Sequence, residues 1–127
     1  MKTITICGKE FDIDCNAYTR FEYKRIFKKG IFDDLGTLQD FATEQERIKK
    51  EMKDKSEEKI AEVLNRVLFN KLDDFIDVIE KIAYILIYTA NKNCGTFEEF
   101  LTGIEKIDLS ESWITEVTEL AVNSFCG

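Results

Sequence analysis

The hydrophobic pattern of residues 72–91 predicts a central helix. Apolar side chains recur there at the three-and-four spacing of one helical face: Leu72, Phe75, Ile76, Ile79, Ile82, Ala83, Leu86 and Ala90. Val78, Ile85 and Ile87 add apolar residues on the other sides, and residues 82–90 carry no charge. This half of the helix is therefore expected to be surrounded by other elements or by a partner subunit. The segment is shorter than the about 20 apolar residues that span a bilayer.

The ends of this helix are marked by polar residues. Asn70 is a plausible N-cap, and Lys92 with Gly95 is expected to close the other end. Asp73, Asp74 and Asp77 would then lie where the helix dipole favours acids. An apolar stripe also runs through the preceding segment without a phase break: Leu64, Leu68, Leu72, Phe75, Ile79, Ile82 and Leu86. One continuous helix is therefore an alternative, but a break near Asn70 is expected.

Alternation of apolar and polar residues predicts a β-hairpin over residues 2–15. Gly8-Lys9 suits the two-residue loop of a type II′ turn, because that turn has glycine first. The resulting register pairs Ile6 with Phe11 and Ile4 with Ile13, so all four side chains share one face. Cys7 and Cys15 would fall on opposite faces and should not form a disulfide.

Capping signals divide the middle of the chain into helices. Asn16 is expected to cap a helix from Ala17 to about Lys29, with Gly30 as its stop. Thr37, with Asp40 three residues on, can open a second helix. Residues 44–59 include 12 charged residues of mixed sign, as in a solvated helix or a mobile connection. Ser56 is then a plausible cap for a third helix, whose apolar residues are Ile60, Val63, Leu64, Val67 and Leu68.

The helix expected at residues 17–29 has a basic side. Tyr23, Ile26 and Phe27 share its apolar side, and the basic residues spread over the opposite arc: Arg20, Lys24, Arg25, Lys28 and Lys29. Tyr18 and Phe21 fall inside that basic arc. These aromatic residues could stack on nucleic-acid bases, hold an acidic partner, or cover the hairpin.

Two further helices are expected near the C-terminus. Thr96 and Glu99 form a capping-box pattern for a short helix over residues 97–107. Residues 108–111 then turn the chain into a last amphipathic helix. Its apolar side carries Trp113, Val117, Leu120, Ala121 and Ser124.

These elements predict a mainly α protein: a short N-terminal β-hairpin packed on a bundle of about five helices, α+β by strict count. With 127 residues, one domain over 1–127 is expected. It divides into a hairpin (1–15), helices with a charged connection (16–55) and a helical core (56–127). The start MKTITIC has no long apolar core behind a basic flank, so a cytoplasmic protein without a signal peptide is expected.

Charge and chemistry argue against an enzyme. The net charge is −7, and residues 70–127 hold 11 acidic but only 4 basic side chains, which disfavours nonspecific nucleic-acid binding there. The chain has no histidine, no glycine-rich phosphate loop and no CxxC pair among its four cysteines. We therefore predict no catalytic, cofactor-binding or metal-binding residues and no membrane partner.

The remaining prediction is a binding surface. The apolar stripes and the open hairpin edges exceed what a monomer of this length is expected to cover, so self-association or binding of another protein's helix is predicted. The candidate partner-binding residues are Tyr18, Phe21, Lys24, Lys28, Tyr84, Ile85 and Ile87.

The order of segments resembles the tail assembly chaperones of long-tailed phages and prophages of Gram-positive bacteria. The similar features are the opening ITICGKEFDID, the NAYTRFEYKRIFKKGIFDDL that follows, the charged middle, and the closing TFEEFLTGIEKID with WITEVTELAVNSF. They cover most of the chain, although they include no catalytic signature. The resemblance is one of layout and local character.

The resemblance implies a non-enzymatic chaperone of the host bacterial cytoplasm that is absent from the mature virion. Such proteins solubilise the tape measure protein and help tail tube protein polymerise around it, and a longer frameshifted form is often made. Two alternatives stay open: a small helical nucleic-acid-binding regulator, and a structural head-tail or tail subunit that is retained in the virion.

Overall fold

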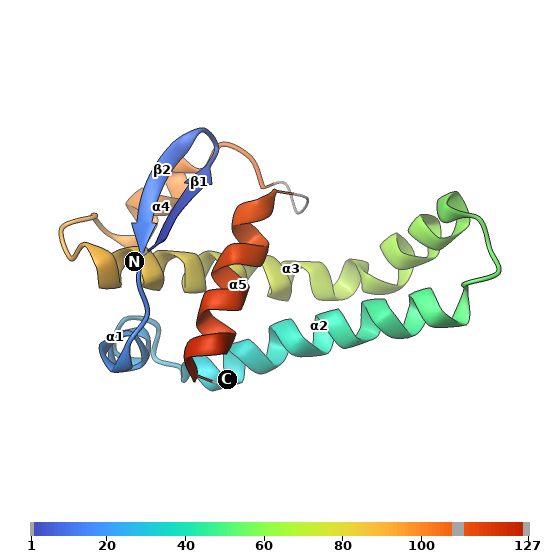
Figure 1. The fold of residues 1–127 in the computed structure, drawn as a ribbon, viewed down its shortest axis with the longest axis horizontal. Coiled ribbons are helices and arrows are strands. Elements are labelled where there is room, and N and C mark those ends of the chain that lie inside the picture. The colour runs from blue at the N-terminus through green and yellow to red at the C-terminus, as the bar shows by residue number, and fades with distance from the viewer. Residues whose placement is uncertain (1, 108–110, 126–127) are drawn as a thin grey trace. The chain divides into compact units, whose positions relative to one another are not determined.

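The computed structural model describes residues 2–107 and 111–125, apart from the side chains of residues 67, 68 and 70. Its elements are β1 (Lys2–Ile6), β2 (Lys9–Ile13), α1 (Ala17–Phe27), α2 (Ile31–Glu51), α3 (Glu57–Ala90), α4 (Phe97–Gly103) and α5 (Ser112–Phe125). The predicted class is confirmed: the chain is mainly helical with an N-terminal antiparallel hairpin (Figure 1). Among the described residues, no helix combines the length and the apolar character needed to cross a membrane.

The chain forms two compact units, which are described separately. The hairpin unit comprises Met1–Ile31 and Ile79–Gly127, and the two-helix unit comprises Phe32–Val78. The long helix α3 therefore gives its first part to the two-helix unit and its C-terminal part to the hairpin unit.

The turn of the hairpin is one residue earlier than predicted. Ile6 pairs with Lys9 and Ile4 with Phe11, so the loop is Cys7-Gly8. Both loop residues have positive φ, 51° and 81°, as a type I′ turn requires. The type II′ prediction is wrong because Cys7 adopts a left-handed conformation that is uncommon for a residue with a Cβ. The Cys7 thiol donates to the Lys106 carbonyl oxygen at 3.3 Å.

The predicted apolar face of the hairpin is correct despite the wrong turn. Moving the loop by one residue shifts the cross-strand pairing by two positions, and side chains in strands alternate with a period of two. Ile4, Ile6 and Ile13 are accordingly buried, and Phe11 on the same face is half-buried. The backbone N–H of Asp14 donates to the carbonyl oxygen of Leu86 at 3.1 Å, which ties the end of the hairpin to α3.

The core of the hairpin unit surrounds the C-terminal part of α3. Every side chain from Ile82 to Ile87 is buried, as the charge-free sequence predicts, and elements of the same unit provide the cover. The Tyr84 ring contacts Phe27, Phe97 and Phe100 of this unit, and α5 packs against β1. The buried side chains of α5 are Trp113, Ile114, Val117 and Ala121. Leu120 is only half-buried and Ser124 is exposed, so these two predicted residues are not part of the buried side of α5.

The predicted starts of α1 and α4 are correct, but their predicted ends are not. The predicted cap at Asn16 and the predicted capping box of Thr96 with Glu99 are confirmed, and Thr19 completes a capping box at Asn16 as well. In contrast, α1 ends at Phe27 with Lys28 as a left-handed C-cap, so the prediction of Gly30 as the stop is wrong. The helix α4 ends at Gly103 rather than at residue 107. The predicted turn at 108–111 lies largely outside the described residues.

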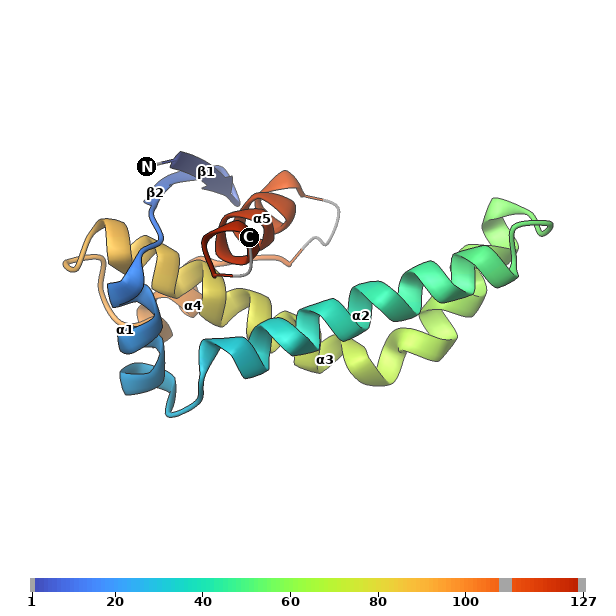
Figure 2. The same cartoon turned by 60° about the horizontal axis from the view of Figure 1, so that its bottom comes forward.

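The two-helix unit is a helical hairpin. Its helices, α2 and the first part of α3, lie side by side in Figures 1 and 2. Phe41 and Ile48 are the buried residues of one hydrophobic cluster in this unit, and the Phe41 ring stacks on Phe75 at a centroid distance of 4.5 Å. Leu35, Leu38 and Val78 are also buried. The partly buried residues packed on this core are Met52, Val63, Leu64, Leu72 and Phe75. The predicted cap at Ser56 is confirmed, since its hydroxyl accepts from the backbone N–H of Lys59 at 3.3 Å.

Two predicted boundaries in this unit are wrong. The helix α2 begins at Ile31, not at Thr37, so residues 31–36 belong to it and Gly36 lies inside the helix. The helix α3 is continuous from Glu57 to Ala90, so there is no break near Asn70. Asp73 and Asp77 are therefore exposed residues of the helix interior, and the helix dipole does not explain their positions.

Candidate functional site

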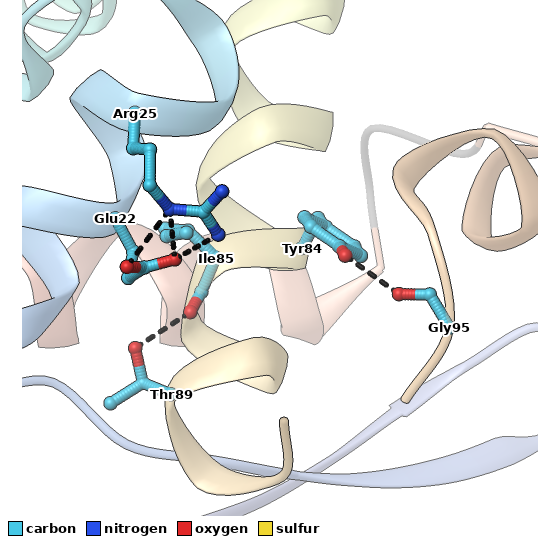
Figure 3. Close-up of polar contacts among 6 residues, drawn as sticks. All are labelled: Glu22, Arg25, Tyr84, Ile85, Thr89 and Gly95. Carbon is cyan, nitrogen blue, oxygen red and sulfur yellow. Dashed lines mark hydrogen bonds and ion pairs between the residues drawn. The ribbon is translucent and has the colours of Figure 1, made fainter. Parts of the chain in front are cut away.

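The inner side of α1 is fixed by a chain of hydrogen bonds to α3. Thr19 Oγ1 accepts from the backbone N–H of Asn16 at 3.0 Å, and it lies 2.8 Å from Thr89 Oγ1. The Thr89 hydroxyl donates to the Ile85 carbonyl oxygen at 2.7 Å (Figure 3). Because that bond uses the proton of Thr89, Thr19 must donate to Thr89. The buried ring of Tyr23 adds apolar contact on the same side, so α1 is held in one orientation.

A buried carboxylate holds Arg25, a cation in the last turn of α1. Glu22 is only 2% exposed, and Arg25 Nε donates to its two oxygens at 2.9 and 3.1 Å. The guanidinium makes a further contact with the same carboxylate (Figure 3). The hydrogen bond from Arg25 lowers the pKa of Glu22 below its usual value. The charge of Arg25 is thus compensated inside the helix and is not free for a partner.

An aromatic pair lies on the outer side of the same helix. Phe21 is 62% exposed and Tyr18 is 37% exposed. Their rings stack with centroids 6.2 Å apart and an interplanar angle of 25°. Lys92 places its Nζ 4.5 Å from the centre of the Tyr18 ring, within the range of a cation–π contact. Large exposed aromatic residues of this kind are typical of interaction surfaces rather than of solvated helix faces.

Cations without a compensating acid flank this aromatic pair. Arg20, Phe21, Lys24 and Arg25 line a shallow depression of about 380 Å³. Arg20, Lys24 and Lys28 are exposed, and their side chains have no ion-pair partner within residues 2–107 and 111–125. We call this region the α1 surface. It consists of Tyr18, Arg20, Phe21, Lys24, Lys28 and Lys92.

The structure divides the predicted partner-binding residues into two sets. Tyr18 and Phe21 lie together on the α1 surface, with Lys24 and the C-cap residue Lys28 along the same helix. In contrast, Tyr84, Ile85 and Ile87 are buried in the core of the hairpin unit. Ile85 has no exposed surface, and Tyr84 and Ile87 reach only the wall of a cavity inside the same unit. We correct the prediction for these three residues and do not carry it further.

Sequence reasoning missed Lys92 as a member of this surface. The sequence suggested only that Lys92 helps to end a helix, and it lies far from residues 18–28 along the chain. Its position over Tyr18 depends on α3 ending next to α1 in the hairpin unit. Periodicity describes one helix at a time, so no pattern in the sequence could bring the two together.

A second concave region lies in the hairpin unit, between the hairpin and α4. This cavity of about 280 Å³ is lined by Ile6, Lys9, Phe11, Tyr84, Ile87, Cys94, Glu99, Phe100, Gly103 and Ile104. The Tyr84 hydroxyl donates to the Gly95 carbonyl oxygen at 2.7 Å (Figure 3). Burial raises the pKa of Tyr84 to about 12 and also raises the pKa of the Cys94 thiol. Both groups therefore stay protonated at neutral pH, which disfavours a role as base or nucleophile.

Neither region has the composition of a metal site. In the part of the chain that the structure describes, no three or more Cys, Asp or Glu side chains gather where they could hold a metal ion. Cys7, Cys15 and Cys94 are free thiols.

Comparison of the chain with protein families, curated proteins and solved structures finds no match to any of them. Function must therefore be inferred from the residues of the α1 surface.

The Glu22–Arg25 contact makes α1 sensitive to acid. Because the folded pKa of Glu22 is lowered, its contribution to stability is complete above the unfolded value near 4.5 and is lost as the pH falls through the folded value. We expect Glu22→Gln to be less stable than the wild type at pH 7 and equally stable below the folded pKa. Urea unfolding at pH 7, 5 and 3 measures this. A stability difference that is unchanged across that range would contradict the prediction.

Proposed function

We propose that this chain is a non-enzymatic phage tail assembly chaperone that binds the tape measure protein through the α1 surface. The observation that carries the proposal is the stacked pair of Tyr18 and Phe21, exposed beside Arg20, Lys24 and Lys28, which have no ion-pair partner in the part of the chain that the structure describes. The order of segments, with its resemblance to these chaperones, supports the choice of partner. The protonated state of Tyr84 and Cys94 at neutral pH agrees with a role that involves no chemistry.

The proposed mechanism is hydrophobic masking. An amphipathic tape measure chain exposes apolar side chains until tail tube protein surrounds it, and exposed apolar surface drives aggregation. The aromatic pair covers part of that surface, while the net charge of −7 keeps the complex in solution. Tube subunits then displace the chaperone. This mechanism places the protein in the host bacterial cytoplasm and outside the mature virion, with self-association as a further expected property.

Co-expression with the tape measure protein tests this proposal. Phe21→Ser removes half of the aromatic pair, and Phe69→Ser is the matched control because Phe69 is an exposed helical phenylalanine in the two-helix unit, 71% exposed. We expect the wild type and Phe69→Ser to keep the tape measure protein soluble and to co-elute with it in size exclusion with light scattering. We expect Phe21→Ser to leave most of it insoluble.

Equal solubilisation by both variants would show that the α1 surface is not the binding site. Failure of the wild type itself would reject the chaperone proposal. Recovery of the chain in purified virions would instead favour the structural-subunit alternative.

A further inference from the structure

The charge balance of the α1 surface indicates which kind of segment it can bind. Within α1 the only acidic residue is Glu22, which is buried and held by Arg25. The exposed side of the helix therefore presents cations without a single carboxylate. A basic segment would be repelled, and an uncharged one would leave the cations unpaired against an apolar partner. The surface favours a partner that supplies carboxylates together with an apolar side chain.

The spacing of the groups matches a helix. Arg20 and Lys24 are four residues apart, so they lie one turn apart on the same face of α1. Phe21 projects beside them and lines the same depression, and Tyr18 extends the aromatic area by its stacking contact. Acidic residues four apart on a partner helix have the matching separation, with an apolar residue between them to contact the rings.

Lys92 closes the other side of the aromatic pair. It comes from the turn after α3, and its ammonium lies over the ring of Tyr18. Cations therefore lie on both sides of the rings, which sets a positive rim around an apolar centre. Partner interfaces commonly combine an apolar anchor with a polar rim of this kind.

We propose that the α1 surface recognises an acidic amphipathic helix, with an apolar residue on the Tyr18–Phe21 pair and carboxylates paired with Arg20, Lys24 and Lys92. This inference rests on the proposed function, and it names the chemistry of the segment that the surface takes from its partner. Elsewhere the chain carries a large acidic excess, which repels such a helix and directs it to the α1 surface.

A peptide-binding experiment with matched charges tests the inference. Two fluorescent amphipathic peptides of identical apolar pattern are compared, one with glutamate and one with lysine on the polar face, by fluorescence anisotropy with the full chain. The variant R20E/K24E reverses two cations of the α1 surface. The control K49E/K50E reverses two exposed cations of α2 and gives the same net charge.

We expect the glutamate peptide to bind the wild type and the control within about twofold of each other, and R20E/K24E to bind at least about tenfold more weakly. We expect the lysine peptide to bind the wild type and the control far more weakly than the glutamate peptide does, and to bind R20E/K24E more tightly than it binds the wild type. Equal weakening by both charge variants would overturn the inference, because only net charge would then matter. Tighter binding of a duplex DNA probe than of the glutamate peptide would also overturn it, in favour of a surface that binds phosphate.

Combining the peptide results with the solubilisation by Phe21→Ser distinguishes failure of the inference from failure of the proposed function. If both peptides bind equally well and Phe21→Ser weakens both, the preference for acid is wrong while apolar masking still stands. If neither peptide binds, but the wild type solubilises the tape measure protein and Phe21→Ser does not, the inferred acidic character of the bound segment is wrong and the proposed function stands. If neither peptide binds and Phe21→Ser solubilises as the wild type does, both proposals fail.

Discussion

Ile85→Asp is expected to prevent the hairpin unit from folding. The side chain of Ile85 is 0% exposed, and its neighbours on α3 from Ile82 to Ile87 are buried too. The substitution removes an apolar side chain whose burial contributes about 1.5–3 kcal/mol. It also places a carboxylate in the core, where desolvation costs several kcal/mol without a partner. The sum is comparable with the whole stability of a small domain, about 5–15 kcal/mol.

Far-UV circular dichroism and Trp113 emission measure this loss. Trp113 is the only tryptophan of the chain and is buried in the hairpin unit, so its emission should shift to the red when this unit unfolds. Phe21→Asp is the matched control, because it introduces the same carboxylate at an exposed position. We expect it to change stability by no more than about 0.5 kcal/mol. Native Trp113 emission in Ile85→Asp would mean that the residue is not part of the core.

This expectation changes how binding data on α3 should be interpreted. A loss of partner binding in Ile85→Asp would follow from unfolding and would say nothing about an interface. Phe21→Ser avoids this problem because Phe21 lies on the α1 surface, where truncation leaves no cavity.

Features set by neighbouring residues could be predicted from the sequence. The capping boxes at Asn16 and Thr96 depend on residues within one helical turn, and both are present. The faces of the hairpin follow from the two-residue alternation, so they were predicted correctly even with the wrong turn. The turn itself was not predictable by rule, because it needs Cys7 at positive φ, a conformation that the sequence does not favour.

Features that depend on competition between signals were harder to predict. Asn70 and the following acids favour a helix start, whereas the apolar stripe favours a continuous helix. The structure has one helix, α3, with Leu64, Leu72 and Phe75 of the stripe packed on the same cluster. The same limit applies to Tyr84 and Ile87. An all-round apolar helix predicts burial without saying whether its own unit or a partner provides the cover.

The candidate site was predicted only in part for the same reason. Tyr18, Phe21 and Lys24 belong to one helix, so periodicity placed them together. Lys92 and the compensation of Arg25 by Glu22 depend on tertiary structure. Without the buried carboxylate, Arg25 would count as a free cation of the surface, and the sequence alone gives no sign that it is not.

Phe41→Ala is expected to unfold the two-helix unit while the hairpin unit stays folded. Phe41 and Ile48 are the two buried residues of one hydrophobic cluster in this unit, and the Phe41 ring stacks on Phe75. Truncation of a buried phenylalanine costs about 3–5 kcal/mol. Ile48, the other buried side chain of this cluster, contributes about 1.5–3 kcal/mol by its burial. A pair of helices owes most of its helical stability to packing of this kind, so loss of the Phe41 ring is expected to exceed what the unit can tolerate.

The unfolding transitions reported by circular dichroism and by Trp113 emission should therefore occur at different urea concentrations. We expect circular dichroism of Phe41→Ala to show early loss of helix, from α2 and the first part of α3, while Trp113 emission changes at the wild-type midpoint. Phe32→Ala is the control, because Phe32 is an exposed phenylalanine at the start of α2. Coincident transitions in Phe41→Ala, both shifted to lower urea, would show that the chain unfolds as one cooperative domain. That result would favour the single domain predicted from chain length, since the continuous helix α3 would then couple the stability of the two cores.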